Sequence, residues 1–249
     1  MTPPLDPPVV ALAIAAHPDD VEFWCGATLA RWAAAGAVVH HLICTDGSKG
    51  TWDADADLAA LVARRQDEQR RAAQRLGATG EVVMLGVVDG ELTNDRATRS
   101  VIAEHIRRLR PNVVFAHDPW KQYRLHPDHR AAGFLAVDSV VAARDPHFFP
   151  EHLVPHHRPD AILLFEAQEV NHLEPAEESH IAARVAALEA HESQFETTHF
   201  SGVADPDQLA GFRTAERDKL RAAAASYRAL IDPTCTAEYG EAFHLITDV

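Results

Sequence analysis

The chain has 249 residues, and its 23 Lys and Arg against 37 Asp and Glu give a formal net charge of −14 with the histidines neutral. A protein whose main partner is nucleic acid or an anionic membrane surface needs a basic face, so this charge argues against both partners. Apolar residues make up 47% and charged residues 24% of the chain, which is typical of a globular protein with a substantial core. Because neither an interdomain linker nor an internal repeat is found, we expect a single domain over residues 1–249.

The sequence predicts a cytoplasmic protein. The first basic residue is Arg31, so the N-terminus lacks the basic start of a secretory signal. The apolar run 9–16 is much shorter than the roughly 20 residues that cross a bilayer, so we expect no membrane insertion. An odd number of cysteines without a close pair is more typical of a reducing compartment than of a disulfide scaffold. The oligomeric state stays open, and a homo-oligomer is one of the alternatives.

The predicted elements alternate between strand and helix. A continuous apolar run at 9–15 is typical of a strand buried on both faces, and the helical patterns that follow often end at glycine. The predicted strands are 9–15, 37–44, 81–85, 112–116 and 161–165. The predicted helices are 26–35, 58–76, 95–110, 127–143, 178–192 and 207–230. The Pro-rich and His-rich segment 145–160 is predicted to be a long loop. This alternation indicates an α/β fold whose mostly parallel sheet is covered on both sides.

Two short motifs place His and Asp together where a strand ends or a helix begins. The first is His-Pro-Asp-Asp at 17–20, directly after the first predicted strand, and the second is His-Pro-Asp-His at 126–129. Proline suits the first position of a helix, so each motif predicts a tight turn into a helix. Residues three apart in such a turn point to one side. Ligands of parallel sheets bind beyond the carboxyl ends of the strands, where we expect both motifs to lie.

These side chains are suited to a metal ion. Imidazole nitrogen and carboxylate oxygen at about 2.0 to 2.2 Å suit Zn²⁺, and a catalytic zinc site holds three protein ligands and leaves a fourth position for water. Each turn on its own could instead be an ordinary helix cap. Two such turns at the functional edge of one sheet favour the metal site. A dinucleotide site is not indicated, because no Gly-x-Gly-x-x-Gly follows the first strand.

Beyond these two turns, the sequence resembles a known family. The stretch 16–23 (Ala-His-Pro-Asp-Asp-Val-Glu-Phe), with 26–30 behind it, and the stretch 126–133 resemble the LmbE-like, or PIG-L, family of zinc-dependent N-deacetylases. The similarity covers most of the chain and extends to Thr45-Asp46-Gly47, Arg65-x-x-Glu68, Asp89-Gly90 and His191-Glu192-Ser193-Gln194. It implies a Rossmann-like three-layer α/β sandwich. It also implies a hydrolase that removes an N-acetyl or similar N-acyl group from an amino sugar or its conjugate.

Residue by residue, the resemblance implies one site with divided roles. The implied zinc ligands are His17, Asp20 and His129. The implied general base is Asp19, and His126, if protonated, polarises the carbonyl oxygen of the amide. Zinc lowers the pKa of bound water to about 7, and a nearby carboxylate can take the proton of that water and pass it to the departing amine. Fe²⁺ suits the same ligands.

Other residues of the resemblance keep two interpretations. Arg65 and Asp89 resemble positions that hydrogen-bond sugar hydroxyls, but a surface ion pair and an Asp-Gly turn explain them equally well. Asp128 is expected to cap its helix or to orient an imidazole. Whether Tyr123 reaches the site stays open, as does the width of a pocket next to the bulky Phe23-Trp24 pair.

The His-rich loop 147–157 could bind a second metal ion, but such loops more often form a lid or a subunit contact.

Three functions are compatible with the sequence. The first is the deacetylase of an amino sugar, and the second is an amidase that cleaves a larger, mycothiol-like thiol conjugate. The third, a non-catalytic metal-dependent binding protein, is disfavoured because binding alone needs neither Asp19 nor His126.

Overall fold

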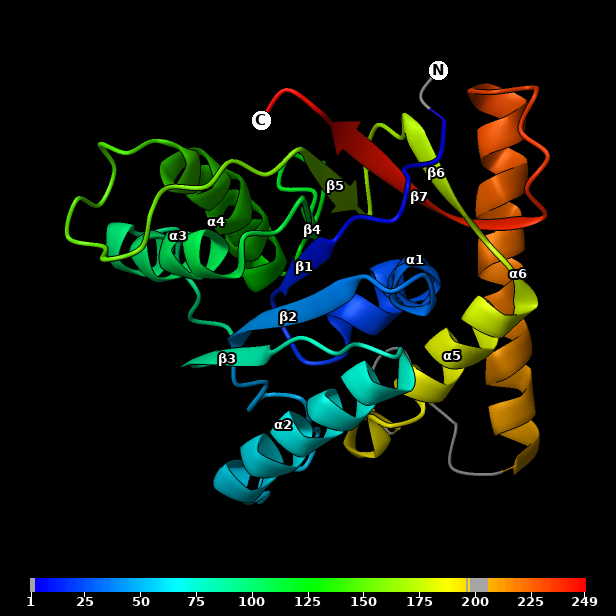
Figure 1. Cartoon of the computed structure of the whole chain (residues 1–249). Coiled ribbons are helices and arrows are strands. Elements are labelled where there is room, and N and C mark those ends of the chain that lie inside the picture. Colours follow the sequence, from blue (N-terminus) through cyan, green and yellow to red (C-terminus); the bar gives the residue numbers. More distant parts are fainter. Residues whose placement is uncertain (1–2, 196, 198–205) are drawn as a thin grey trace.

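The computed structural model describes residues 3–195, 197 and 206–249, and it is built around one sheet with helices on both faces (Figure 1). The strand order is β3-β2-β1-β4-β5-β7-β6. The strands are β1 Val10–Ala15, β2 Val38–Thr45, β3 Val82–Val87, β4 Val113–His117, β5 Ala161–Phe165, β6 His172–Ala176 and β7 Tyr239–Ile246. The helices are α1 Asp20–Ala34, α2 Leu58–Arg75, α3 Arg96–Leu109, α4 Pro127–Arg144, α5 Glu178–Leu188, the 3₁₀ turn η1 Glu192–Gln194 and α6 Pro206–Leu230.

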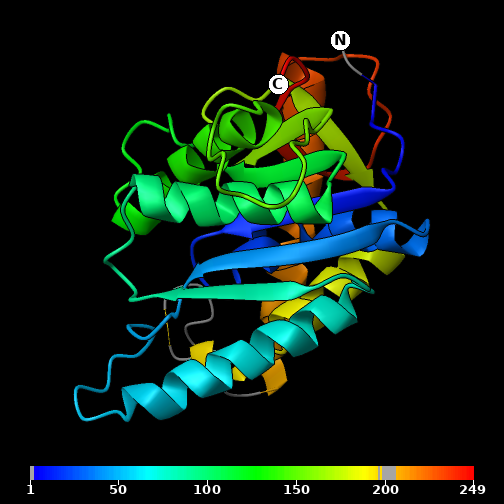
Figure 2. The same cartoon turned by 60° about the vertical axis from the view of Figure 1, so that its left-hand side comes forward.

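The sheet is mostly parallel, as predicted. Strands β1 to β5 pair in parallel, whereas β7 runs antiparallel between β5 and β6. Helices α1, α2 and α5 cover one face and α3 and α4 the other, and the turned view of Figure 2 shows these two helical layers on either side of the sheet. The expected three-layer α/β sandwich is therefore confirmed.

The sequence did not predict β6 and β7. The segment that forms β6 contains Glu174 and Pro175, residue types that are rare in strands. Proline is tolerated there because β6 is the last strand of the sheet, and a sheet edge does not need every backbone N–H. Strand β7 becomes recognisable only through its partners, since it inserts between β5 and β6 from the C-terminal end of the chain.

Helix α1 begins at Asp20, six residues before the predicted start at 26. The backbone N–H of Phe23 already bonds the carbonyl oxygen of Asp19, at 3.1 Å, so the first helical turn closes on the His-Pro-Asp-Asp motif itself. The motif therefore stands at the junction of β1 and α1. Its side chains are attached to two rigid elements rather than to a mobile loop.

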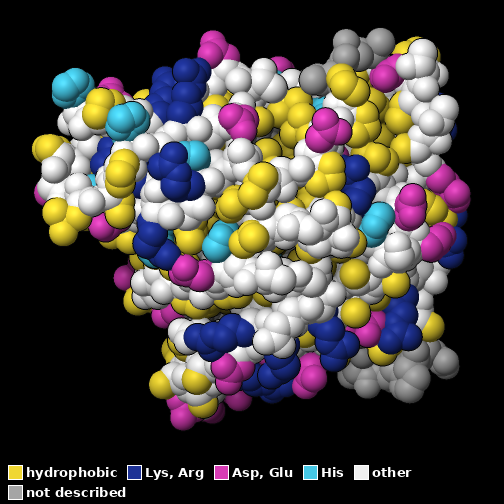
Figure 3. Space-filling view, viewed as in Figure 1, with side chains coloured by type: hydrophobic (Ala, Val, Ile, Leu, Met, Phe, Trp, Pro, Cys, Tyr) yellow, Lys and Arg dark blue, Asp and Glu magenta, His cyan; other side chains and the backbone are white. Residues whose placement is uncertain are grey.

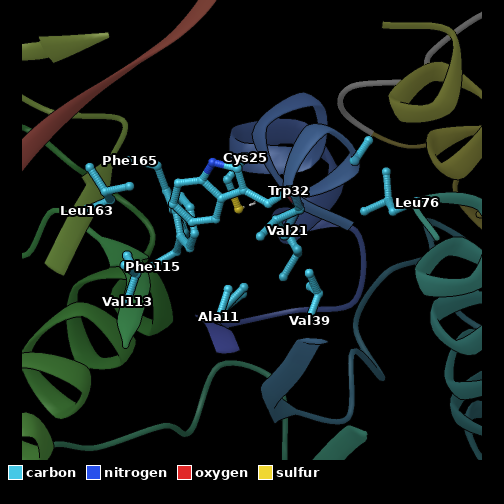
Figure 4. Close-up of a cluster of buried hydrophobic side chains, with 14 of the residues drawn as sticks. Ala11, Val21, Cys25, Trp32, Val39, Leu76, Val113, Phe115, Leu163 and Phe165 are labelled. Carbon is cyan, nitrogen blue, oxygen red and sulfur yellow. Dashed lines mark hydrogen bonds between the residues drawn. The ribbon is translucent and has the colours of Figure 1, made fainter. Parts of the chain in front are cut away.

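The core beneath α1 explains how this junction is held. Along β1, Ala11, Ala13 and Ala15 face α1, and their small side chains leave space for large groups from neighbouring elements. The indole of Trp32 fills that space next to the ring of Phe115 (Figure 4), and the ring centroids are 5.1 Å apart. Both residues are fully buried. The other face of β1 packs Leu12 and Ile14 against α3 and α4, which confirms that this strand is buried on both faces.

The surface carries charges of both signs. On the face drawn in Figure 3, basic and acidic side chains are interspersed, including over α2, where Arg70 pairs with Asp67. Within the described residues, no helix combines the length and the apolar character that a membrane span requires.

Gly133 of α4 packs against the end of β4. A Cβ there would lie 2.7 Å from the carbonyl oxygen of His117 and 3.0 Å from the backbone nitrogen of Pro119, and backbone atoms cannot easily move away. We expect Gly133→Ala to lower the free energy of unfolding by about 1–3 kcal/mol, the usual cost of overpacking. Thermal unfolding measures this effect.

The matched control is Gly211→Ala in α6, where a Cβ meets nothing within 4 Å. Helix propensity alone then leaves stability unchanged or raises it by up to about 1 kcal/mol. Equal unfolding temperatures for the two variants would show that α4 does not press on β4 in this way.

Candidate functional site

The first His-Asp motif turns sharply between β1 and α1. Asp19 adopts a left-handed backbone conformation with φ of 93°, which is uncommon for a residue with a side chain. The backbone N–H of His17 donates to the Asp20 carboxylate at 2.8 Å and closes the turn. The two adjacent carboxylates therefore have different partners, because Asp20 contacts histidines and Asp19 contacts the guanidinium of Arg65.

The second motif begins α4 and meets the first. Pro127 is the first residue of the helix, and His126 precedes it with extended backbone. The ring of His126 lies 4.6 Å from that of His17 and 4.9 Å from that of His129, between centroids. Asp128 is fully buried and accepts backbone N–H groups of Gly90 and, farther along, residue 92, at 2.6 and 3.2 Å. It thus ties the loop after β3 to α4 rather than acting as a free acid.

Three residues converge between the two motifs. Nδ1 of His17 lies 3.1 Å from Nε2 of His129 and 3.4 Å from Oδ2 of Asp20, and Nε2 of His129 lies 3.3 Å from Oδ1 of Asp20. Ligands at about 2.1 Å from a tetrahedral Zn²⁺ are about 3.4 Å from one another. The spacings are therefore close to those between the ligand atoms of a tetrahedral metal site.

Other residues around this point could also contribute a ligand. Besides His17, Asp20 and His129, three overlapping groups in the described part of the chain have ligand atoms within 4.8 Å of one another. The groups are His17 with His126 and His129, Asp20 with His117 and His129, and His17 with Asp89 and Asp128. None of them includes a histidine of the 147–157 loop. In that loop, His152 instead contacts Arg107 and Ser100, and His157 contacts the carbonyl oxygen of Pro111.

The other nitrogen of His17 also has partners. Its Nε2 lies 3.2 Å from Oδ2 of Asp128 and 3.2 Å from Oδ1 of Asp89. A metal-bound imidazole usually donates its second N–H to a carboxylate, which fixes the tautomer and the ring orientation. The arrangement leaves Nδ1 of His17 as the free ligand atom.

Two residues of the site were not predicted from the sequence. His117 ends β4, and its Nε2 lies 3.3 Å from Oδ2 of Asp20. Glu166 follows β5 with φ of 55°, and its Oε2 lies 3.1 Å from Nδ1 of His117 and 3.5 Å from Nδ1 of His129. Arg124 pairs with the other carboxylate oxygen at 2.8 Å. The strand-end rule could have found both residues, since His117 and Glu166 stand where neighbouring parallel strands finish.

Burial and mutual contact shift the pKa values of these groups. Burial alone would raise the pKa of Asp20, but His129 and His117 beside it hold that pKa well below the usual range. Burial lowers the pKa of His129 to about 4. Although burial also acts to lower the pKa of His17, Asp128, Asp20 and Asp89 raise it well above the ordinary value.

Asp19 is electrostatically distinct from Asp20. Burial raises the pKa of Asp19 to about 6, although the guanidinium of Arg65, 3.2 Å away, acts in the opposite direction. Arg65 is only 3% exposed, so it is not a surface ion pair, and it also donates to the carbonyl oxygens of Gly47 and Pro18, each at 2.8 Å. Arg65 therefore hydrogen-bonds the backbone around Asp19, and it also faces the cavity.

These groups open into a cavity of about 580 Å³, a size typical of ligand sites. The cavity is lined by His17, Asp19, Asp20, Arg65, Asp89, His126 and His129, together with Phe23, Trp52 and other residues. Phe23 forms part of the wall but leaves the cavity open, and Trp52 is 77% exposed at its edge. Tyr123 is 85% exposed and is not among the lining residues. Burial and the adjacent His17 lower the pKa of His126.

Comparisons with known proteins identify the family of the chain. The sequence model of the PIG-L family, described as GlcNAc-PI de-N-acetylase, matches residues 12–140. The chain is 35% identical to a diacetylchitobiose deacetylase of Thermococcus kodakarensis over 187 residues, which cover 74% of this chain and 69% of that protein. It is 36% identical to 1D-myo-inositol 2-acetamido-2-deoxy-alpha-D-glucopyranoside deacetylase 2 of Saccharopolyspora erythraea over 56% of this chain and 59% of that enzyme.

Solved structures show the same fold. An N,N'-diacetylchitobiose deacetylase from Pyrococcus horikoshii superposes with a TM-score of 0.82 at 27% identity, over 96% of this chain and 84% of that chain. A 4-carboxy-2-hydroxymuconate hydratase from Pseudomonas putida has a TM-score of 0.72 at 19% identity, over 96% of each chain, a likeness of fold alone. The family is assigned from the sequence matches, because a shared fold alone does not identify it. The chain belongs to the PIG-L, or LmbE-like, family of deacetylases, which are hydrolases of amide bonds.

Proposed function

We propose that this protein is a zinc-dependent N-deacetylase that removes the acetyl group from the nitrogen of an amino sugar or its conjugate. The observation that carries the proposal is the convergence of His17, Asp20 and His129, whose donor atoms lie 3.1 to 3.4 Å apart, next to Asp19 in an open cavity. Fe²⁺ suits the same donors, so the choice of zinc as the metal used in the cell is itself part of the proposal. The substrates in the names of the related deacetylases support the substrate class.

The residues divide the chemistry of amide hydrolysis among them. Zinc, when bound by His17, Asp20 and His129, supplies Lewis acidity that activates water and polarises the carbonyl of the substrate. The Asp19 carboxylate accepts a proton from the attacking water and passes that proton to the nitrogen as the carbon–nitrogen bond breaks, so that the leaving group departs as a neutral amine. The products are acetate and the free amino sugar.

Two neighbours support this proton transfer. Arg65 holds Oδ2 of Asp19 at 3.2 Å, which leaves the other carboxylate oxygen to face the water. His126 lies at the cavity wall and donates an N–H to the carbonyl oxygen as negative charge develops on it. Donors that are already oriented before the reaction stabilise this charge without a reorganisation cost.

Asp89 and Arg65 are proposed to contact the sugar. Both line the cavity, and Asp89 is 6% exposed with its carboxylate held by His17 and the backbone N–H of Lys49. A fixed carboxylate can accept hydrogen bonds from hydroxyl groups.

We propose the cytoplasm as the compartment of the protein, since Cys25, Cys44 and Cys235 are all free thiols.

A panel of amides tests the substrate class. N-acetylglucosamine, diacetylchitobiose, an N-acetylglucosaminyl inositol and a mycothiol-like conjugate would each be incubated with the zinc-loaded protein, and free amine and acetate measured. We expect amine and acetate in equal amounts from at least one N-acetyl amino sugar. Release of an acyl-cysteine from the thiol conjugate, with no acetate from any sugar, would instead support the larger amidase.

Asp19→Asn tests the base. An amide of the same size cannot accept the proton, so we expect kcat to fall by about 10²–10⁴-fold while the bound metal is unchanged. The matched control is Asp55→Asn in the exposed loop before α2, which should keep wild-type turnover. Full activity of Asp19→Asn would remove Asp19 from the mechanism. No turnover by the wild-type protein on any amide would favour a binding protein.

Glu166→Gln tests the support of the metal ligands. The carboxylate contacts both His117 and His129, and loss of such an outer partner typically weakens metal binding by about 10–100-fold. Zinc affinity, measured by competition with a chromogenic chelator, should fall accordingly, and His17→Ala should bind still more weakly. Glu151→Gln, at an exposed ion pair with Arg96, serves as the control. Unchanged zinc affinity in His17→Ala would exclude His17 as a ligand.

A further inference from the structure

A cluster of polar side chains lies in the core beneath Asp19 and takes no direct part in the proposed amide hydrolysis. It consists of Glu22 of α1, His41 of β2, Gln69 of α2 and His191, and each of these side chains is completely buried. Burying polar groups at such depth lowers the stability of the fold unless they are hydrogen-bonded, so we expect these residues to have a specific role. His191 also belongs to the late motif that the metal site left unexplained.

The amide of Gln69 connects this cluster to the catalytic turn. Its Nε2 donates to Oε1 of Glu22 at 2.8 Å, and its Oε1 accepts the backbone N–H of Asp19 at 2.9 Å. A flipped amide would place an acceptor against the Glu22 carboxylate and a donor against the N–H of Asp19. Glu22 therefore fixes the orientation in which Gln69 presents an acceptor to Asp19.

Arg65, one helical turn before Gln69 on α2, holds the other end of the same peptide group. The carbonyl oxygen of Pro18 accepts from Nη2 of Arg65 at 2.8 Å, and the next N–H along the chain is that of Asp19. Residues four apart on a helix lie on one face, so a single face of α2 grips both polar atoms of the Pro18–Asp19 peptide. Rotation of that peptide plane would break both hydrogen bonds.

The position of α2 is itself fixed by the late motif. Glu68 accepts from the backbone N–H of Ser193 at 2.8 Å and from its hydroxyl at 2.5 Å. Nε2 of His191 lies 3.4 Å from Oε2 of Glu22, and Nδ1 of His41 lies 3.6 Å from Oε1 of Glu22. The buried carboxylate is thus enclosed from two sides and cannot swing away from Gln69.

We propose that Gln69 is a positioning residue for Asp19. Together with Arg65 it clamps the Pro18–Asp19 peptide and stabilises the left-handed conformation of Asp19, which directs the Asp19 carboxylate away from the ligands, and Glu22 orients Gln69 for this task. The inference rests on the proposed role of Asp19 as the base. It differs from a purely structural role because it acts on proton transfer and leaves metal and substrate binding intact.

Gln69→Met, which keeps the size of the side chain but removes its amide, tests the clamp. A misplaced base costs up to about 100-fold in rate, so we expect kcat to fall by about 10- to 100-fold with KM and zinc affinity within about twofold of wild type. Gln74→Met, at an exposed position of the same helix, is the matched control and should keep wild-type kinetics. Unchanged kcat in Gln69→Met would overturn the proposal.

A double-mutant cycle separates positioning from general damage. In the Asp19→Asn background Gln69→Met should change the residual turnover by less than about twofold, because groups that act as a unit are not additive. The same fold-loss in both backgrounds would indicate a structural defect and overturn the clamp. Wild-type turnover in Asp19→Asn would instead overturn the proposed role of Asp19 as the base, and no turnover by the wild-type protein would overturn the proposed function, so these failures are distinguishable.

A reciprocal exchange covers the case in which Gln69→Met fails to fold. Gln69→Glu alone places two carboxylates together and should lower kcat, whereas Gln69→Glu with Glu22→Gln restores one donor and one acceptor in the pair at the same total charge. The exchanged carboxylate at 69 can still accept from the N–H of Asp19. We expect the double variant to recover kcat to within about fivefold of wild type, in line with pairwise coupling between contacting residues. No recovery relative to Gln69→Glu would contradict the role of Glu22.

Discussion

Two adjacent carboxylates, Asp19 and Asp20, have to face different partners, and the left-handed backbone of Asp19 is what separates them. Such a conformation costs of order 1–3 kcal/mol and persists only where the surroundings enforce it. Here the enforcement is local and specific: Asp20 is bonded to the backbone of His17, and the Pro18–Asp19 peptide is held from α2. Without this turn, the two carboxylates could not take the separate roles that we propose for them, metal binding by Asp20 and proton transfer by Asp19.

The order of the strands supplies the rest of the site. Strands β1, β4 and β5 are neighbours and run in parallel, so the residues that follow them lie side by side at one edge of the sheet. His17 follows β1, His117 ends β4 and Glu166 follows β5, so that His117 contacts Asp20 on one side and Glu166 on the other. Helix α4 then brings His129 onto the same point. Gly133 allows this close approach because it lets α4 pack directly on the backbone after β4.

The sequence predicted the parts of this arrangement that are carried by local patterns. Apolar runs and amphipathic helices placed β1 to β5 and the main helices, and the two His-Pro-Asp turns drew attention to His17, Asp20, His126 and His129. His117, Glu166 and Gln69 have no motif around them, and their roles arise from contacts between residues far apart in the chain. Strands β6 and β7 were not predicted for the same reason. Pro175 in β6 and the late position of β7 in the chain can be explained only once the partner strands are known.

The fold leaves the reaction undecided, because a hydratase shares it at 19% identity, and chemistry has to be argued from side chains. The metal ligands alone would serve a binding protein as well as an enzyme. Asp19 argues for catalysis, since it is kept off the ligand set and surrounded by groups that control its direction and its proton affinity. Burying Glu22 and two histidines beneath it is costly in free energy. A site that only bound a metal ion would gain nothing from that cost, whereas a base that must point at one water molecule would.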